Sequence, residues 1–204
     1  MKDAGETAET KGVNIRLKRA AAFFTAMWLL TGIAYPLAVY AAAQQLFPQQ
    51  AEGSLIKDKN NNTIGSELIG QYFTGPKYFQ PRPSATAGRP YNPMASGGSN
   101  MGPTNKGLVE AFSDRASYWK NASNASVIPS DLVTASASGL DPHISVESAY
   151  LQAPNIAKER GIETEEINEL IDKQAEKPIL GIIGTNRVNI LMLNKALDAL
   201  EDAQ

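Results

Sequence analysis

The side chains most able to do chemistry are one histidine with acids and serines close to it. They are Asp131, Ser136, Ser138, Asp141 and His143. An acid that orients a histidine, which in turn activates a serine hydroxyl, would form a hydrolytic triad. The same residue types supply the internal hydrogen bonds of an ordered loop, and we favour that interpretation.

Short motifs that resemble those of serine enzymes are incomplete. Gly97–Gly102 approaches a nucleophile elbow around Ser99, but Met101 stands where that motif needs glycine. Ser54–Lys57 and Ser117–Lys120 have the serine–lysine spacing of penicillin-recognising enzymes without the partner Ser-Asp-Asn and Lys-Thr-Gly motifs. None of these patterns is enough to indicate an enzyme.

Metal and cofactor chemistry has few candidate ligands. The chain has no cysteine and one histidine, which excludes iron–sulfur clusters, thiolate zinc sites and multi-histidine sites. Asp141 and Glu147 are two carboxylates that could share a cation, but two carboxylates are a weak calcium signal. The chain also lacks a Gly-x-x-x-x-Gly-Lys-Ser/Thr phosphate-binding loop. We expect it to bind no metal or cofactor by itself.

The segment Ala20–Ala43 is an apolar run of 24 residues. At ~1.5 Å per residue such a helix crosses a hydrocarbon core of ~30 Å. The bases just before it are Lys11, Arg16, Lys18 and Arg19. The first charge after it is Glu52, so we expect a cytoplasmic N-terminus and an extracytoplasmic C-terminal part. A signal peptide cleaved after Ala43 is the rival interpretation, but signal cores are only ~7–15 residues long.

The sequence therefore divides into three parts. Residues 1–19 are predicted to be a disordered cytoplasmic tail and 20–43 a transmembrane helix with a kink or close helix contact at Gly32 and Pro36. Residues 52–204 have the size of one domain. The formal net charge of the whole chain is −2, too small to imply a nucleic-acid partner.

Periodicity in 52–204 predicts an α+β domain with few strands. The expected elements are a hairpin of 53–56 with 63–69, a helix capped by Thr104 or Asn105, helices at 145–151 and from Pro154, a helix capped by Thr164, a buried strand at 179–183 and a helix at 187–200. Arg115 lies on the buried face of its helix, where we expect it to pair with an acid.

The glycine- and proline-rich segment 75–107 is predicted to be a long ordered loop, because tyrosines and phenylalanines interleave it. Its bases are Lys77, Arg82, Arg89 and Lys106, with no acid between Glu67 and Glu110. Outside the cytoplasm, an acidic protein partner or lipid headgroups fit this surface better than single-stranded nucleic acid. Four simply solvated charges are the other interpretation.

Six blocks of this sequence together resemble one family. They are GSLI (53–56), GSELIGQ (65–71), YFQPRPSA (78–85), SGGSNMGPTN (96–105), PSDLVTASASGLDPHIS (129–145) and RVNILMLNKALD (187–198). In this order they are similar to the C subunit of the Kdp potassium-transporting ATPase. The similarity runs from about Thr31 to Asp198.

This resemblance implies a bacterial or archaeal plasma-membrane complex. Its A subunit holds potassium, its P-type ATPase B subunit hydrolyses ATP with Mg²⁺, and a small F subunit assists. The C subunit would have no catalytic site of its own. It would act as a catalytic chaperone, which here means that it raises the ATP affinity of the B subunit. This chain lacks the phosphorylation motif Asp-Lys-Thr-Gly-Thr, so we expect the hydrolytic site on another chain.

Contacts with partner subunits are expected within the span and the resembling blocks. The residues we single out are Gly32, Pro36, Arg82, Ser96, Asn100, Asp141, His143, Arg187 and Asn189. The alternative hypothesis is a membrane-anchored periplasmic hydrolase that uses a serine in the 96–102 or 136–138 loops. A free-standing surface-binding domain is the third.

Overall fold

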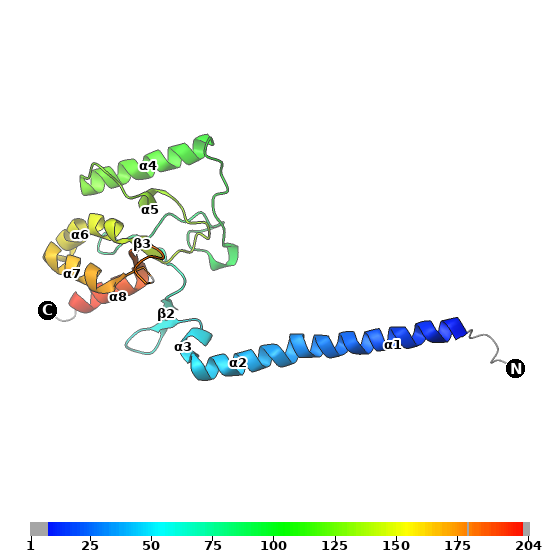
Figure 1. The fold of residues 1–204 in the computed structure, drawn as a ribbon. Coiled ribbons are helices and arrows are strands. Elements are labelled where there is room, and N and C mark those ends of the chain that lie inside the picture. Colours follow the sequence, from blue (N-terminus) through cyan, green and yellow to red (C-terminus); the bar gives the residue numbers. More distant parts are fainter. Residues whose placement is uncertain (1–7, 179, 202–204) are drawn as a thin grey trace. The chain divides into compact units, whose positions relative to one another are not determined.

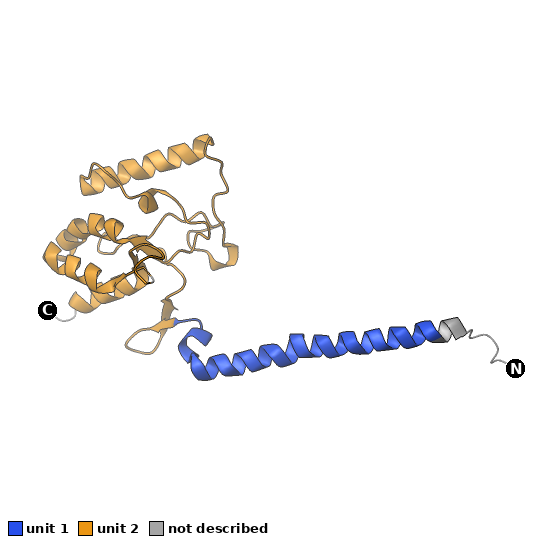
Figure 2. Ribbon diagram, in the orientation of Figure 1, with its two compact units in different colours: residues 1–54 blue, residues 55–204 orange. Residues whose placement is uncertain are grey.

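The computed structural model describes residues 8–178 and 180–201. The chain forms two compact units, residues 1–54 and residues 55–204 (Figure 2). The first unit is helical and the second is a mixed α+β domain (Figure 1). The predicted fold class, α+β with one membrane helix, is confirmed.

The first unit is one nearly continuous helical run. It consists of α1 (Ala8–Leu29), the π-helix η1 (Leu30–Ala34), α2 (Tyr35–Leu46) and the short α3 (Pro48–Ala51). Gly12–Leu46 is long and apolar enough to cross a membrane and contains the predicted span. Because α1 begins at Ala8, the prediction of a disordered tail is wrong for residues 8–19, into which the helix of the span continues by cooperative propagation. Residues 1–7 lie outside the described residues.

The helix is irregular at the predicted place. Pro36 has no N–H, and its ring would clash with the carbonyl of Gly32 in a regular α-helix. The wider turn η1 lies directly before it, as π-turns often do where the regular ladder is interrupted. The hydroxyl of Thr31 donates to the carbonyl of Met27 at 2.8 Å.

Two small antiparallel sheets are present in the part of the second unit that the structure describes. The predicted hairpin is present as β1 (Leu55–Lys57) and β2 (Thr63–Ser66). The second sheet has the order β3-β5-β4, with β3 (His143–Ser145), β5 (Arg187–Asn189) and β4 (Ala175–Glu176). The central strand is therefore close to the C-terminal end of the domain.

The described residues of the second unit form five α-helices. They are α4 (Lys106–Ser123), α5 (Ser130–Val133), α6 (Val146–Arg160), α7 (Thr164–Gln174) and α8 (Ile190–Glu201). Helices α6, α7 and α8 pack in sequence, and α4 lies on α5 and α6 (Figure 1). Ile144 and Val188 of the sheet join the core with apolar side chains of these helices. The long segment between β2 and α4 contributes Phe79, which is fully buried.

This segment is ordered, as predicted, although its only regular element is the 3-10 turn η2 (Pro93–Ala95) within the described residues. Two side-chain amides replace a neighbouring strand. Asn194 accepts from the Phe79 N–H at 2.9 Å and donates to its carbonyl at 3.1 Å. Gln152 does the same for Gln80, at 2.7 and 3.2 Å. The buried backbone is thereby satisfied without a sheet.

Two helix boundaries and one side-chain contact differ from the predictions. Pro154 lies inside α6 instead of starting a new helix, because the burial of residues such as Ala153 and Ile156 outweighs the proline's cost of about 3 kcal/mol. Helix α7 is preceded by Glu163 at the cap position, with Thr164 as its first residue. Arg115 donates to the carbonyl of Val133 at 2.9 Å, and so serves the C-terminal end of α5 instead of an acid.

The predicted buried strand at 179–183 is wrong for the described residues of that stretch. Leu180 and Ile182 are 86% and 82% exposed and lie in a turn. Gly181 has a positive φ, which breaks an extended run. The predicted helix from Arg187 is also corrected, because Arg187–Asn189 pairs with both neighbouring strands before α8 begins.

Candidate functional site

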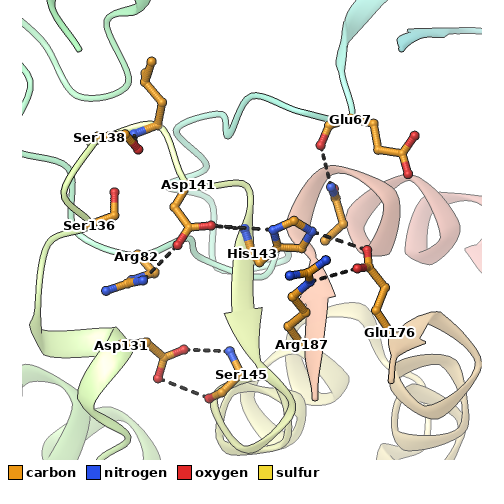
Figure 3. Close-up of polar contacts among 12 residues, drawn as sticks. Glu67, Arg82, Asp131, Ser136, Ser138, Asp141, His143, Ser145, Glu176 and Arg187 are labelled. Carbon is orange, nitrogen blue, oxygen red and sulfur yellow. Dashed lines mark hydrogen bonds and ion pairs between the residues drawn. The ribbon is translucent and has the colours of Figure 1, made fainter. Parts of the chain in front are cut away.

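A row of two arginines, two carboxylates and one histidine crosses the second sheet (Figure 3). Arg82 Nη1 lies 2.8 Å from Asp141 Oδ2, and Asp141 Oδ1 lies 3.6 Å from Nδ1 of His143. Nε2 of His143 lies 3.3 Å from Glu176 Oε1, and Glu176 Oε2 accepts from Arg187 Nε at 2.9 Å. These five residues are separated by up to 105 positions in sequence and meet through the fold.

The pairing register of the strands brings these side chains together. Glu176 of β4 is the Cα partner of Arg187 in β5, so the two opposite charges lie directly across the ladder. His143 of β3 faces Asn189 of β5. The backbone N–H of His143 donates to Asp141 at 3.0 Å, a local turn that fixes the carboxylate beside the ring.

Burial and hydrogen bonds act in opposite directions on Asp141. Burial raises its pKa, but hydrogen bonds from His143 and from Arg82 outweigh that effect, and the pKa lies below its usual value. Burial, followed by the nearby Asp141 charge, raises the pKa of Tyr91, whose hydroxyl donates to the Arg82 carbonyl at 2.8 Å. The site therefore holds an ionised carboxylate beside a neutral phenol.

The hydrolytic triad, which was the less favoured interpretation of the sequence, is not assembled. Both ring nitrogens of His143 face carboxylates. Ser136 Oγ accepts from the N–H of Gly139 at 2.9 Å, and Ser138 Oγ accepts from the N–H of Leu140 at 3.1 Å. These serines stabilise their own loop, which is the interpretation that the sequence favoured.

Asp131 has a structural role. It accepts from the Ser145 N–H at 2.7 Å and from the hydroxyls of Ser145 and Ser148 at 3.1 and 2.6 Å. Ser145 in turn caps α6 by accepting from the Ser148 N–H. The acid thus ties α5 to the start of α6.

An open cleft of about 1050 Å³ runs beside this row of side chains. Asp141 and Glu147 both line it, together with Arg82 and Arg187. Within residues 8–178 and 180–201 no group of three or more metal-ligating side chains comes together. The Asp141 oxygens are already used by Arg82 and His143, so the pair that the sequence suggested is poorly suited to a cation.

The remaining singled-out residues lie in three settings. Ser96 donates to the carbonyl of Ser138 at 3.1 Å. Asn100 is exposed and has a positive φ of 52°. Asn189 is only 3% exposed; it donates to the Glu67 carbonyl at 2.8 Å, and its side-chain oxygen accepts from the first N–H groups of α8. Asn189 therefore stabilises the domain's own backbone.

Gly32 and Pro36 belong to the first unit, at η1 and the start of α2. A Cβ added to Gly32 would make only ordinary contact with Trp28, at 3.7 Å. The helix itself therefore does not require glycine here.

Comparison with known proteins decides the family. The family model "KdpC: K+-transporting ATPase, c chain" matches residues 17–199. The chain belongs to the KdpC family. It is 52% identical over 187 residues to the potassium-transporting ATPase KdpC subunit of Polaromonas naphthalenivorans, covering 91% of this chain and 95% of that protein. The corresponding subunit of Geotalea uraniireducens is 49% identical, over 90% of this chain and 97% of that protein.

Membership of the KdpC family makes this chain an accessory subunit in potassium transport that assembles with other subunits of a K⁺-transporting ATPase. The resemblance predicted from the six sequence blocks is confirmed. The contact of Glu176 with His143 and the capping of α8 by Asn189 were not predicted from the sequence. An asparagine directly before the apolar period of 190–200 was the available signal for the second.

Proposed function

We propose that this chain is a non-catalytic accessory subunit that assembles and stabilises an ATP-driven potassium uptake complex with the Kdp A, B and F subunits. ATP, Mg²⁺ and K⁺ act on those partners. The proposal that the chain is non-catalytic rests on the position of His143, the chain's only histidine. Its two ring nitrogens face Asp141 and Glu176, so it does not activate a serine hydroxyl.

The charge around the apolar helix supports an extracytoplasmic position of the second unit. Arg16, Lys18 and Arg19 lie before its apolar part, and no charge follows it until Glu52. Basic flanks stay in the cytoplasm. In this topology residues 55–204 lie across the membrane from cytoplasmic ATP.

The proposed effect on ATP is therefore allosteric. A subunit outside the cytoplasm raises the ATP affinity of the B subunit only if it binds two states of the pump with different affinities. The second unit is suited to such a role because its long loop is held rigidly, through Asn194 at Phe79 and Gln152 at Gln80. A rigid surface can favour one conformation of a partner without ordering itself on binding.

Purification in mild detergent tests this proposal. The chain should co-purify in fixed stoichiometry with the A, B and F subunits, and the complex should have potassium-stimulated ATPase activity. A complex prepared without the chain should lose most of that activity, and adding the purified chain should restore it. A chain that purifies alone and cleaves an ester or peptide would support the hydrolase alternative instead.

A further inference from the structure

An exposed apolar loop joins β4 to β5. Leu180, Ile182 and Ile183 are 86%, 82% and 63% exposed. Single apolar side chains are ordinary on protein surfaces, but three within four positions form a local apolar patch. None of the three belongs to the hydrophobic core of the domain, so packing within the domain does not explain these residues.

The backbone of this loop is unusual as well. Leu180 has a φ of 55°, and Gly181 and Gly184 have φ values of 76° and 103°. A left-handed backbone is unfavourable for leucine and is normally held in place by surrounding contacts. The exposure of the Leu180 side chain means that the domain itself supplies little of that compensation. A contact outside the domain would supply it.

The charge beside the patch favours an anionic surface. Arg187 is paired with Glu176 at 2.9 Å, so Lys177 is the base that remains for a ligand outside the domain. An apolar tip with a base beside it is suited to the boundary between lipid headgroups and acyl chains. Protein interfaces are instead enriched in aromatic side chains and methionine, and the segment from Lys177 to Asn189 contains neither.

The chain's own anchor makes such a contact feasible. Gly12–Leu46 is long and apolar enough to span a bilayer, and only Glu52–Ser54 separate α3 from β1. Three residues span about 10 Å at full extension. A domain tethered this closely meets the bilayer at a high effective concentration, so a small apolar contact is sufficient.

We propose that Leu180–Gly184 together with Lys177, here called the apolar loop, is a second membrane contact of this chain. Leu180, Ile182 and Ile183 enter the headgroup–acyl boundary, and Lys177 lies near lipid phosphates. The contact restricts rotation of the domain about its short connection to the anchor. This contact requires the membrane anchor, and it does not require that the chain changes the ATP affinity of a partner subunit.

Depth-dependent fluorescence quenching tests the apolar loop. Because the chain has no cysteine, Ile182→Cys gives a single labelling site in the full chain. The labelled chain is reconstituted into bilayers of phosphatidylethanolamine and phosphatidylglycerol, alone and with the other subunits. Met94→Cys is the matched control, because Met94 is apolar, 91% exposed and lies in η2 of the same domain.

Lipids with a quencher near the headgroup should quench the probe at 182 and leave the probe at 94 unchanged. In bilayers without the quencher, the emission of the probe at 182 should lie to the blue of that at 94. Equal quenching at both positions would overturn the proposal. Quenching at 182 that disappears when the other subunits are present would also overturn it, and would indicate a protein partner over the apolar loop.

Charge provides an independent readout. Lys177→Gln in the Ile182→Cys chain should weaken the contact about fivefold, as expected for one base near an anionic surface. Replacing phosphatidylglycerol by phosphatidylcholine should also reduce quenching. No dependence on either change would contradict the role of Lys177. The ATPase activity of the same samples tests the proposed function separately, so failure of one proposal is distinguishable from failure of the other.

Discussion

The carboxylate of Asp141 lies 2.8 Å from the guanidinium of Arg82 and ties the proline-rich segment to the start of β3. Both side chains are about three-quarters buried, with 26% and 23% of their surface exposed. Within the described residues, Arg82 Nε is a buried nitrogen without a hydrogen-bond partner. The charge of Arg82 is therefore balanced chiefly by this one acid.

Asp141→Asn should destabilise the chain at neutral pH by about 1–3 kcal/mol, because a partly buried arginine loses its ionised partner. The pKa of Asp141 lies below its ordinary value of 3.8 in the folded state. Such a group contributes stability above 3.8 that is lost as the pH falls through the folded pKa. Denaturant unfolding of the full chain in detergent, at neutral and acid pH, measures both effects.

The matched control for this prediction is Asp114→Asn, because Asp114 is an exposed acid of α4. It should change stability by less than about 0.5 kcal/mol. Stability that falls equally in Asp141→Asn and wild-type chains between neutral and acid pH would contradict the assigned role of Asp141.

Asn194→Ala should cost about 2–4 kcal/mol of unfolding free energy, because the buried N–H and carbonyl of Phe79 both lose their partner. Asn186→Ala is the control, since Asn186 is exposed, and should have little effect. Thermal or chemical unfolding of the two variants makes the comparison. Equal stabilities would mean that the amide does not hold the segment.

Ser99→Ala, Ser136→Ala and Ser138→Ala, made separately, should each leave potassium-stimulated ATPase activity of the complex within about twofold of wild type. The hydroxyls of Ser136 and Ser138 accept backbone N–H groups, and losing one such bond costs about 0.5–1.5 kcal/mol of stability. Complete loss of activity in a variant that still assembles would revive the hydrolase hypothesis.

Replacing Ala20–Ala43 by an unrelated apolar helix should preserve membrane insertion but abolish co-purification with the other subunits. A narrower change is Pro36→Leu, which restores an N–H that can bond to the Gly32 carbonyl and should remove the π-turn. Its yield in the complex should fall, whereas Phe23→Leu, outside the irregular turn, should assemble normally. Normal assembly of Pro36→Leu would show that the turn is not a packing surface.

Local patterns predicted much of the second unit. The asparagines of 60–62 marked the hairpin turn, which Asp58 closes by accepting from the N–H groups of Asn60 and Asn62. Asn105 and Ser145 cap their helices as expected. These features depend on interactions over a few residues, which is why sequence spacing carries them.

Features that depend on distant partners were not predictable in the same way. Asn194 and Phe79 are 115 positions apart, and no periodicity links them. The exposed turn around Ile182 contradicts a pattern that is typical of a buried strand, because exposure depends on what surrounds a segment. Likewise Glu176 meets His143 only through the register of β4, β5 and β3.

The apparent affinity for ATP tests the central claim most directly. Potassium-stimulated ATP hydrolysis by the reconstituted A, B and F subunits should be measured against ATP concentration, with and without the full-length chain. The account predicts a clearly lower KM for ATP when the chain is present, with no nucleotide bound by the chain alone. An unchanged KM and maximal rate in a fully assembled complex would contradict it.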